Sequence, residues 1–504
     1  MSGYLEKLMN SIDIAFSLVK GMTKSEKRYF KMMSEMQKGE KGYIALFDAL
    51  DEEERLDEMT LKKLKVSFPG NALETSRKHL YKVIMKSLRQ FSHEDIDVRI
   101  MNLLHDARIL HNKGLIKPSF DVLDKIKSLS LHREKFGYYI LAARLELQFL
   151  VREQFVGMTE TDLLEKQNKV SEIIEQESKL NKHSILYEIL HFRYYKSGIA
   201  RSQHDVTQLN DLLLEEYQLL RDPGYKSFEA DQLHLHFQST YFQMTANPQG
   251  SLEVFHDLNT LFQEHEKFWI DTPLYYVQLL DGILHGLRQM DRYDDMDFFI
   301  GQLEKTMARA GDLELIVKYR IMAHELNKRV DQEMYEEAMK LLEHNVLDAK
   351  KDAEQLPFLL RCQLMLAIAR TYLSAGQYSP ALRIINNVLN QPLSTANQSV
   401  GIQFQLMNLL VNALMNDVSY VQHALRSIER KLKADRKLYD TELLILSSLK
   451  AWVAFKPAEN LDEKLIALCE NPFERQLIKD LCLKQWVKKM KFRKTSVRRG
   501  VQKK

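Results

Sequence analysis

The sequence is poor in the two residues that most often interrupt helices. It has 18 glycines and 10 prolines in 504 residues, against a typical usage of about 7% and about 5%. Valine-rich runs that alternate with polar residues, which would predict half-buried strands, are also missing. Leu, Lys, Glu, Met and Gln are abundant instead, and apolar residues recur mostly with the 3.6-residue helical period. The composition therefore predicts an all-α protein.

Cysteine is scarce, and long apolar runs are absent. The three cysteines, Cys362, Cys469 and Cys482, lie far apart, and an odd number without paired spacing argues against a disulfide framework or a zinc site. No stretch approaches the ~18 consecutive apolar residues of a membrane span. Glu6 and Asp13 interrupt the N-terminal stretch where a secretion signal would have its apolar core. We expect a cytoplasmic protein without a transmembrane segment.

The motifs of common enzyme and metal sites are missing as well. The sequence has no HExxH, no GxSxG, no glycine-rich phosphate loop and no dinucleotide fingerprint. His234 and His236 are two residues apart, so on a helix they point in different directions and cannot share a metal. The acidic run at residues 291–297 lacks the glycine and the closing glutamate of a calcium loop. We expect no enzyme activity, no catalytic residues, no metal and no cofactor.

The clearest pattern in the chain is a helical hairpin at residues 359–392. Two amphipathic stretches flank a short turn, in which Gly376 can adopt the left-handed conformation that ends a helix and Pro380 suits the first turn of the next. The apolar positions that recur at helical spacing are Met365, Ile368, Ala369 and Tyr372 in the first stretch and Ala381, Ile384, Ile385, Val388 and Leu389 in the second. Each stretch has one apolar face, so the two are expected to pack together.

This hairpin resembles a tetratricopeptide (TPR) unit. The resemblance rests on Ile368, Ala369, Tyr372, Gly376, Tyr378 and Ala381. It departs from the family pattern at Met365, where an aromatic residue is usual, and at Pro392, which comes one residue early. Looser copies occur at residues 102–126 and 275–303. One further hairpin fits into the 85 residues between Asp291 and Gly376, so the spacing is about 42 residues per hairpin, longer than the usual period of roughly 34. The resemblance implies a right-handed α-solenoid of about nine stacked hairpins, since such hairpins cannot bury their apolar faces alone.

Three regions are expected along the chain. Residues 1–96 do not fit the hairpin pattern and are predicted to form an N-terminal helical cap domain. Residues 97–490 are predicted to form the TPR-like solenoid, ending in a helix at residues 473–490 that covers the last hairpin. Residues 491–504 are too basic and too poor in apolar residues to order alone, and we expect a disordered tail. Residues 484–504 carry ten Lys and Arg and no acid, so the formal charge of +3 leaves −7 on residues 1–483.

The resemblance also implies which residues face the groove of such a solenoid. They are Arg108, Asn112, Gln278, His285, Arg288, Gln363 and Arg370. The lysine and asparagine pattern of the family's carboxylate clamp is not reproduced. Arginine favours planar acidic groups through forked hydrogen bonds, although these arginines could equally solvate the inner surface only. The leading hypothesis is a non-enzymatic interaction scaffold that binds a protein or peptide partner in the concave face.

The alternative hypothesis is a nucleic-acid- or ribosome-associated regulatory protein. Basic residues recur about every fourth position in a predicted helix that begins near Asn71, and others lie in the tail. The candidate contacts are Lys78, Lys82, Lys86, Arg89, Arg493, Lys494, Arg498 and Arg499. Such a stripe could contact phosphates, but it is also what an ordinary solvated helix face shows. The tail could equally meet RNA, an anionic membrane surface or the acidic body of the protein. The sequence leaves the oligomeric state open.

Overall fold

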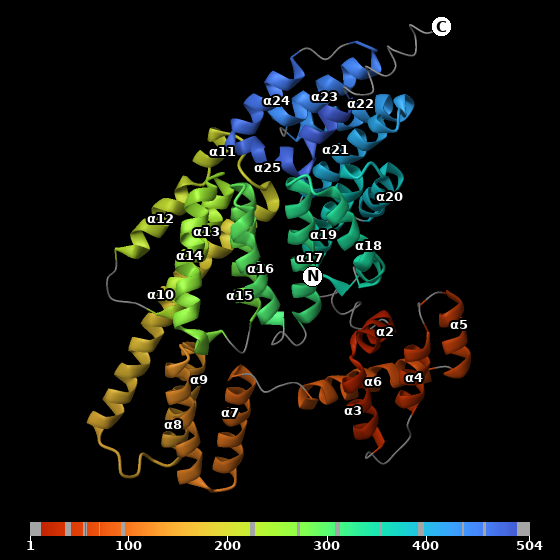
Figure 1. Cartoon of the computed structure of the whole chain (residues 1–504). Helices are drawn as coiled ribbons and strands as arrows, with labels where there is room; N and C mark the ends of the chain where they lie inside the picture. The colour runs from red at the N-terminus through yellow and green to blue at the C-terminus, as the bar shows by residue number, and fades with distance from the viewer. Residues whose placement is uncertain are drawn as a thin grey trace, which may run out of the picture. The chain divides into compact units, whose positions relative to one another are not determined.

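The computed structural model (Figure 1) describes residues 12–490 except 36–41, 54–55, 57, 70, 92–95, 222–226, 270–272, 308–312, 353–354, 392–397, 436–437 and 457–459. The described residues form 24 labelled α-helices, a short 3-10 helix and a further helical stretch at 483–490, without a strand. The prediction of an all-α protein is therefore confirmed. None of the described helices is long and apolar enough to span a bilayer. The chain divides into two compact units between Asn102 and Leu103.

The first unit is built around the long helix α6. Its helices are α2 (Ile12–Gly21), α3 (Lys24–Glu35), α4 (Gly42–Glu52), α5 (Glu58–Ser67), α6 (Ala72–Phe91) and the first part of α7 (Ile96–Asn112). The rings of Phe30 and Phe47 stack at 4.4 Å between centroids, and both side chains are fully buried. Leu80 and Ile84, one turn apart on α6, are buried in the same core. The unit therefore has its own hydrophobic core.

The second unit is a succession of packed helices. After α7 they are α8 (Ile116–His132), α9 (Phe136–Arg152), α10 (Glu160–Ser197), α11 (Gln203–Thr207), α12 (Asn210–Leu220), α13 (Phe228–Met244), α14 (Pro248–Glu264), α15 (Leu274–Gln289), α16 (Tyr293–Met307), α17 (Glu314–Asp331), α18 (Tyr335–Asp352), α19 (Phe358–Ser374), α20 (Tyr378–Leu389), α21 (Gln398–Leu414), α22 (Val418–Ala434), α23 (Asp440–Val453), α24 (Leu461–Glu470) and α25 (Pro472–Asp480). From α13 to α24 each helix packs against the next in sequence, as antiparallel neighbours joined by short turns do.

From α13 onward six hairpins in this unit share one turn, and Gly114 and Glu134 end α7 and α8 in the same way. Each turn contains a residue with positive φ, here called the turn residue; the six are Ala246, Asp291, Glu333, Gly376, Asn416 and Phe455. In every case the next residue donates its N–H to the carbonyl five positions earlier, as Gln377 does to Tyr372 at 2.8 Å. This is the longer hydrogen bond of a Schellman helix end. The intervals between turn residues are 45, 42, 43, 40 and 39, which bracket the expected spacing of about 42.

The described part of the chain ends in a broken helix. Residues 472–490, called the C-terminal segment below, consist of α25, a break at Leu481 and Cys482, and a second helical stretch at 483–490. The periodicity predicts one continuous helix over residues 473–490, and this prediction is wrong. Cys482 has a φ of 51°, which a continuous right-handed helix does not allow. The break changes the direction of the chain, and Leu477 and Trp486 on its two sides are both buried.

Candidate functional site

The first helices of the shared hairpins carry polar residues at corresponding positions. Counted back from the turn residue, positions 2, 6 and 13 fall within about 40° on one side of a helix, because each residue advances about 100°. This side is called the inner face below. On α15, α17 and α19 its residues are Gln289, Asp331 and Ser374 at position 2, His285, Asn327 and Arg370 at position 6, and Gln278, Arg320 and Gln363 at position 13.

The C-terminal segment occupies the half of the inner face that lies near the turns. Gln289 donates to the side-chain oxygen of Gln476 at 2.9 Å. Ser374 donates to the side-chain oxygen of Gln485 at 2.7 Å. Positions 2 of two different hairpins are thus bonded to two residues of one helical segment.

Lysines of the same segment bind the carboxyl-terminal ends of the hairpin helices. Lys479 donates to the carbonyl oxygen of Arg288 at 2.8 Å, and Lys489 donates to those of Leu373 at 2.7 Å and Ser374 at 2.9 Å. The last carbonyls of a helix have no partner within the helix and carry partial negative charge. The two lysines therefore donate hydrogen bonds to carbonyl groups at the carboxyl-terminal ends of α15 and α19.

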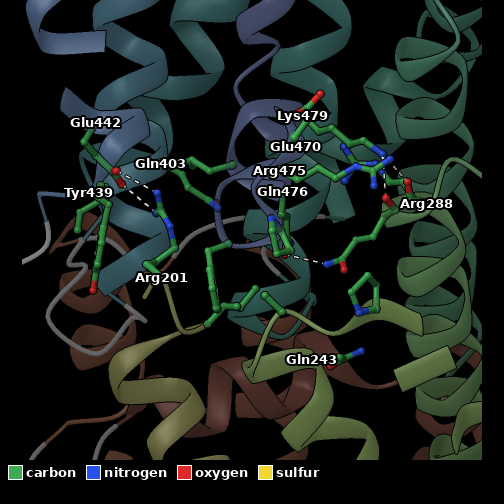
Figure 2. Close-up of a pocket in the computed structure, with 18 of the residues that line it drawn as sticks. Arg201, Gln243, Arg288, Gln403, Tyr439, Glu442, Glu470, Arg475, Gln476 and Lys479 are labelled. Atoms are coloured by element: carbon green, nitrogen blue, oxygen red, sulfur yellow. Dashed lines mark hydrogen bonds and ion pairs between the residues drawn. The ribbon is translucent and has the colours of Figure 1, made fainter. Parts of the chain in front are cut away.

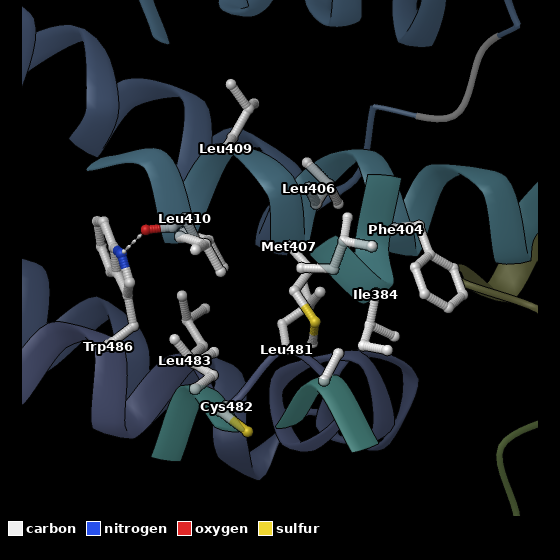
Figure 3. Packing of buried hydrophobic residues seen from close by; sticks show 14 of the residues in the cluster. Ile384, Phe404, Leu406, Met407, Leu409, Leu410, Leu481, Cys482, Leu483 and Trp486 are labelled. Atoms are coloured by element: carbon white, nitrogen blue, oxygen red, sulfur yellow. Dashed lines mark hydrogen bonds between the residues drawn. The ribbon is translucent and has the colours of Figure 1, made fainter. Parts of the chain in front are cut away.

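Apolar side chains anchor the segment to the same hairpins (Figure 3). Leu481, Leu483 and Trp486 are each at most 2% exposed and belong to the large core that also contains α19 and α21. The indole N–H of Trp486 donates to the carbonyl oxygen of Leu410 on α21 at 3.0 Å. A buried indole needs such a partner for its N–H. The segment is an integral part of this core.

Two arginines expected in the groove are buried beneath the segment. Arg288 binds Asp331 at 2.7 Å and Asp480 at 2.9 Å, and Arg370 binds Asp331 at 2.6 Å. Burial alone would raise the pKa of Asp331, but the two arginines hold it well below its usual range. Arg370 is only 1% exposed and also donates to the backbone oxygen of Lys479 at 3.0 Å. These guanidinium groups are thus bonded to acids of the chain itself.

The half of the inner face at position 13 is open. Gln278 and Gln363 are exposed there. Between them Arg320 forms an ion pair with Asp281, which also accepts from His324 at 2.7 Å. Burial would raise the pKa of Asp281, but Arg320 and His324 keep it well below its usual range. The open half thus exposes the amides of Gln278 and Gln363, and the charge of Arg320 between them is neutralised by Asp281.

The remaining predicted residues are placed as follows. His285 lies at the contact with the C-terminal segment, within hydrogen-bond distance of Gln289 at 2.9 Å and Gln476 at 3.2 Å. Arg108 and Asn112 on α7 are exposed. In the first unit, α6 presents Lys78, Lys82, Lys86 and Arg89, all exposed, and Lys78 pairs with Glu74 at 3.4 Å. Arg493, Lys494, Arg498 and Arg499 lie outside the described residues.

A pocket of about 180 Å³ opens beside the C-terminal segment (Figure 2). It is formed where the end of α10, the turn between α13 and α14, the end of α15 and the starts of α21, α23 and α25 converge. Its lining comprises Ser197, Ile199, Arg201, Gln243, Ala246, Pro248, Arg288, Gln289, Ile402, Gln403, Tyr439, Glu442, Glu470, Pro472, Phe473, Arg475, Gln476, Leu477 and Lys479. Residues far apart in the sequence thus form one site.

Sequence reasoning did not find Arg201, which lies at one end of this pocket. Its guanidinium binds Glu442 at 3.0 Å, forms an ion pair with Glu474 and lies 4.8 Å from the centroid of the Tyr439 ring. Arg201 and Glu442 are 241 residues apart, so no local pattern links them. Within the described part of the chain, no group of three His, Cys, Asp or Glu side chains could hold a metal ion.

Comparison with known proteins gives no relative. No protein-family model, no curated protein and no solved structure matches the chain.

Proposed function

We propose that the protein is a non-enzymatic interaction scaffold. In this proposal residues 97–490 form a TPR-like α-solenoid, residues 1–96 form its N-terminal cap domain, and the protein acts in the cytoplasm. A protein or peptide segment binds the open half of the inner face, around Gln278 and Gln363.

One observation carries the proposal: two hairpins, α15/α16 and α19/α20, already hold a helical segment through corresponding positions. Gln289 and Ser374 bond to Gln476 and Gln485 of the C-terminal segment, which is the helix-in-groove mode that helical scaffolds use for partners. Because this segment fills the half near the turns, a partner has the position-13 half available. The recurrence of one turn at 39 to 45 residues supports the repeat architecture.

The test is affinity purification with Gln278 and Gln363 both changed to arginine. Each side chain is exposed, so the fold should tolerate the change, while added bulk and charge should block a partner. Changing Arg288 or Arg370 would be uninformative, since both are buried in ion pairs. Proteins recovered with the wild type should be lost from the double variant.

Gln422 provides a matched control. It is an exposed glutamine on α22, the second helix of its hairpin, and Gln422→Arg should retain every partner of the wild type. If the folded Gln278 and Gln363 double variant recovers the same proteins as the wild type, the open half of the inner face is not the binding surface.

A second candidate function is nucleic-acid binding by the first unit. Its support is that Lys78, Lys82, Lys86 and Arg89 are all exposed on α6. Phosphate contacts release counterions, so binding to RNA or DNA should weaken steeply between about 50 and 200 mM salt. A flat salt response, or no complex at low salt, would reject this function.

A further inference from the structure

The pocket beside the C-terminal segment has charged walls whose charges are already matched. Arg201 pairs with Glu442 and Glu474, and Arg288 pairs with Asp331 and Asp480. An anionic ligand would need a positively charged side chain to pair with, and Arg201 and Arg288 are already paired with acids of the protein.

The two other cations of the pocket share one acid. Lys479 lies 2.6 Å from Asp291, and Arg475 forms an ion pair with the same carboxylate. Glu470 is the one lining acid without such a pair among the described residues, and it is exposed. Because burying an unpaired charge is costly, the lining favours a ligand without net charge.

Among the described lining residues, the half-buried polar groups left for a ligand are amides. The side chains of Gln243 and Gln403 are half-buried and make no hydrogen bond within the described part of the chain. Figure 2 shows them on opposite sides of the space between the labelled residues. Each amide has one oxygen that accepts and one nitrogen that donates. A ligand that satisfies both must offer donors and acceptors.

Much of the remaining lining is apolar. Ile199, Ile402 and Phe473 line the pocket together with Pro248 and Pro472. An engineered apolar cavity of about 150 Å³ accommodates benzene, so the pocket volume of about 180 Å³ suits one substituted ring or a small bicyclic ring.

We propose that this pocket binds a neutral planar heterocycle with an amide-like edge, such as a nucleobase or a nicotinamide ring, between the amides of Gln243 and Gln403. The ring lies against the apolar walls, and its polar edge exchanges hydrogen bonds with the two glutamines. This site is separate from the partner surface at Gln278 and Gln363, and either can exist without the other.

The decisive probes are nicotinamide and nicotinate, which share a ring and differ in the amide and the carboxylate. Titration calorimetry with the full-length wild type should show binding of nicotinamide and at least about tenfold weaker binding of nicotinate, because the pocket cations are already paired. Adenine, as a neutral base, serves as a second probe. Equal binding of the two nicotinic probes, or no binding of nicotinamide and adenine at millimolar concentration, would overturn the proposal.

Variants test the assigned contacts. Gln403→Leu and Gln243→Leu each remove one amide at similar volume and should weaken binding of the neutral probe by about fivefold, the effect of one hydrogen bond. Gln422→Leu, outside the pocket, should bind as the wild type does. Equal weakening in all three variants would assign the effect to the fold and reject the contacts. The wild-type comparison of the two nicotinic probes still decides the proposal if a variant fails to fold.

Discussion

Replacing Trp486 with alanine should remove much of the stability of the second unit. The side chain is 2% exposed and lies in the core shared with α19 and α21. Truncation of a buried aromatic residue to alanine costs about 3–5 kcal/mol, through lost burial and the cavity left behind. Since whole domains are stable by only about 5–15 kcal/mol, this single change should remove a fifth or more of the total.

A second variant separates packing from hydrogen bonding. Trp486→Phe keeps an aromatic ring but cannot donate to the carbonyl of Leu410, which accepts from the indole at 3.0 Å. One hydrogen bond contributes about 1 kcal/mol. Trp486→Phe should therefore lower the free energy of unfolding by about 1–2 kcal/mol, including a small packing defect. Its stability should lie between that of the wild type and that of Trp486→Ala.

Urea unfolding followed by circular dichroism measures the free energy of unfolding of the wild type, Trp486→Ala and Trp486→Phe. Because the domains of a chain need not unfold in one transition, the measured change is the shift of the transition that the Trp486 variants affect. If Trp486→Ala unfolds within about 0.5 kcal/mol of the wild type, the C-terminal segment does not stabilise the hairpins that it covers, and the reasoning from burial is refuted.

Three further outcomes are expected. Removing residues 491–504 should leave the melting temperature nearly unchanged and weaken polyanion binding; a loss of several degrees would make the tail part of the terminal cap. Burial lowers the pKa of His236 to about 4, so its neutral form is favoured on folding and its contribution to stability is lost as the pH falls from about 6.5 towards 4. Between pH 7 and pH 5 the wild type should lose about 2 kcal/mol more than His236→Leu in urea titrations; equal losses would contradict this. Arg370→Leu should cost about 3–5 kcal/mol in thermal or urea unfolding, because Asp331 keeps only one of its two arginines; a neutral result would mean that Arg288 alone neutralises the carboxylate.

Local patterns were sufficient to predict the hairpins. The periodicity around Gly376 correctly gave α19, α20 and the turn between them, because helix spacing and a left-handed glycine are local signals. The five other turn residues are not glycine, although a left-handed conformation costs such residues roughly 1–2 kcal/mol. Tertiary packing therefore sets these turns, and a search for glycine finds one of the six, together with Gly114 at the end of α7.

The candidate sites could be predicted less well, because they depend on long-range pairing. The sequence placed Arg288 and Arg370 on the inner side of their helices, but gave no sign that Asp331 and Asp480 neutralise them. Arg288 and Asp480 are 192 residues apart. The break at Cys482 was missed for the same reason, since the residues around it have good helical periodicity and only the surrounding hairpins require a change of direction.

The position of the C-terminal segment also sets the order in which the protein can be completed during synthesis. A ribosome adds about 5–20 residues per second, so the 192 residues that separate Arg288 from Asp480 take about 10–40 s to make. During that interval the end of α15 exists without Lys479, which later binds its carbonyl, and the end of α19, once made, exists without Lys489. The nascent chain therefore passes through a long-lived stage with an unfilled inner face, which ends only after residues 472–490 have been made.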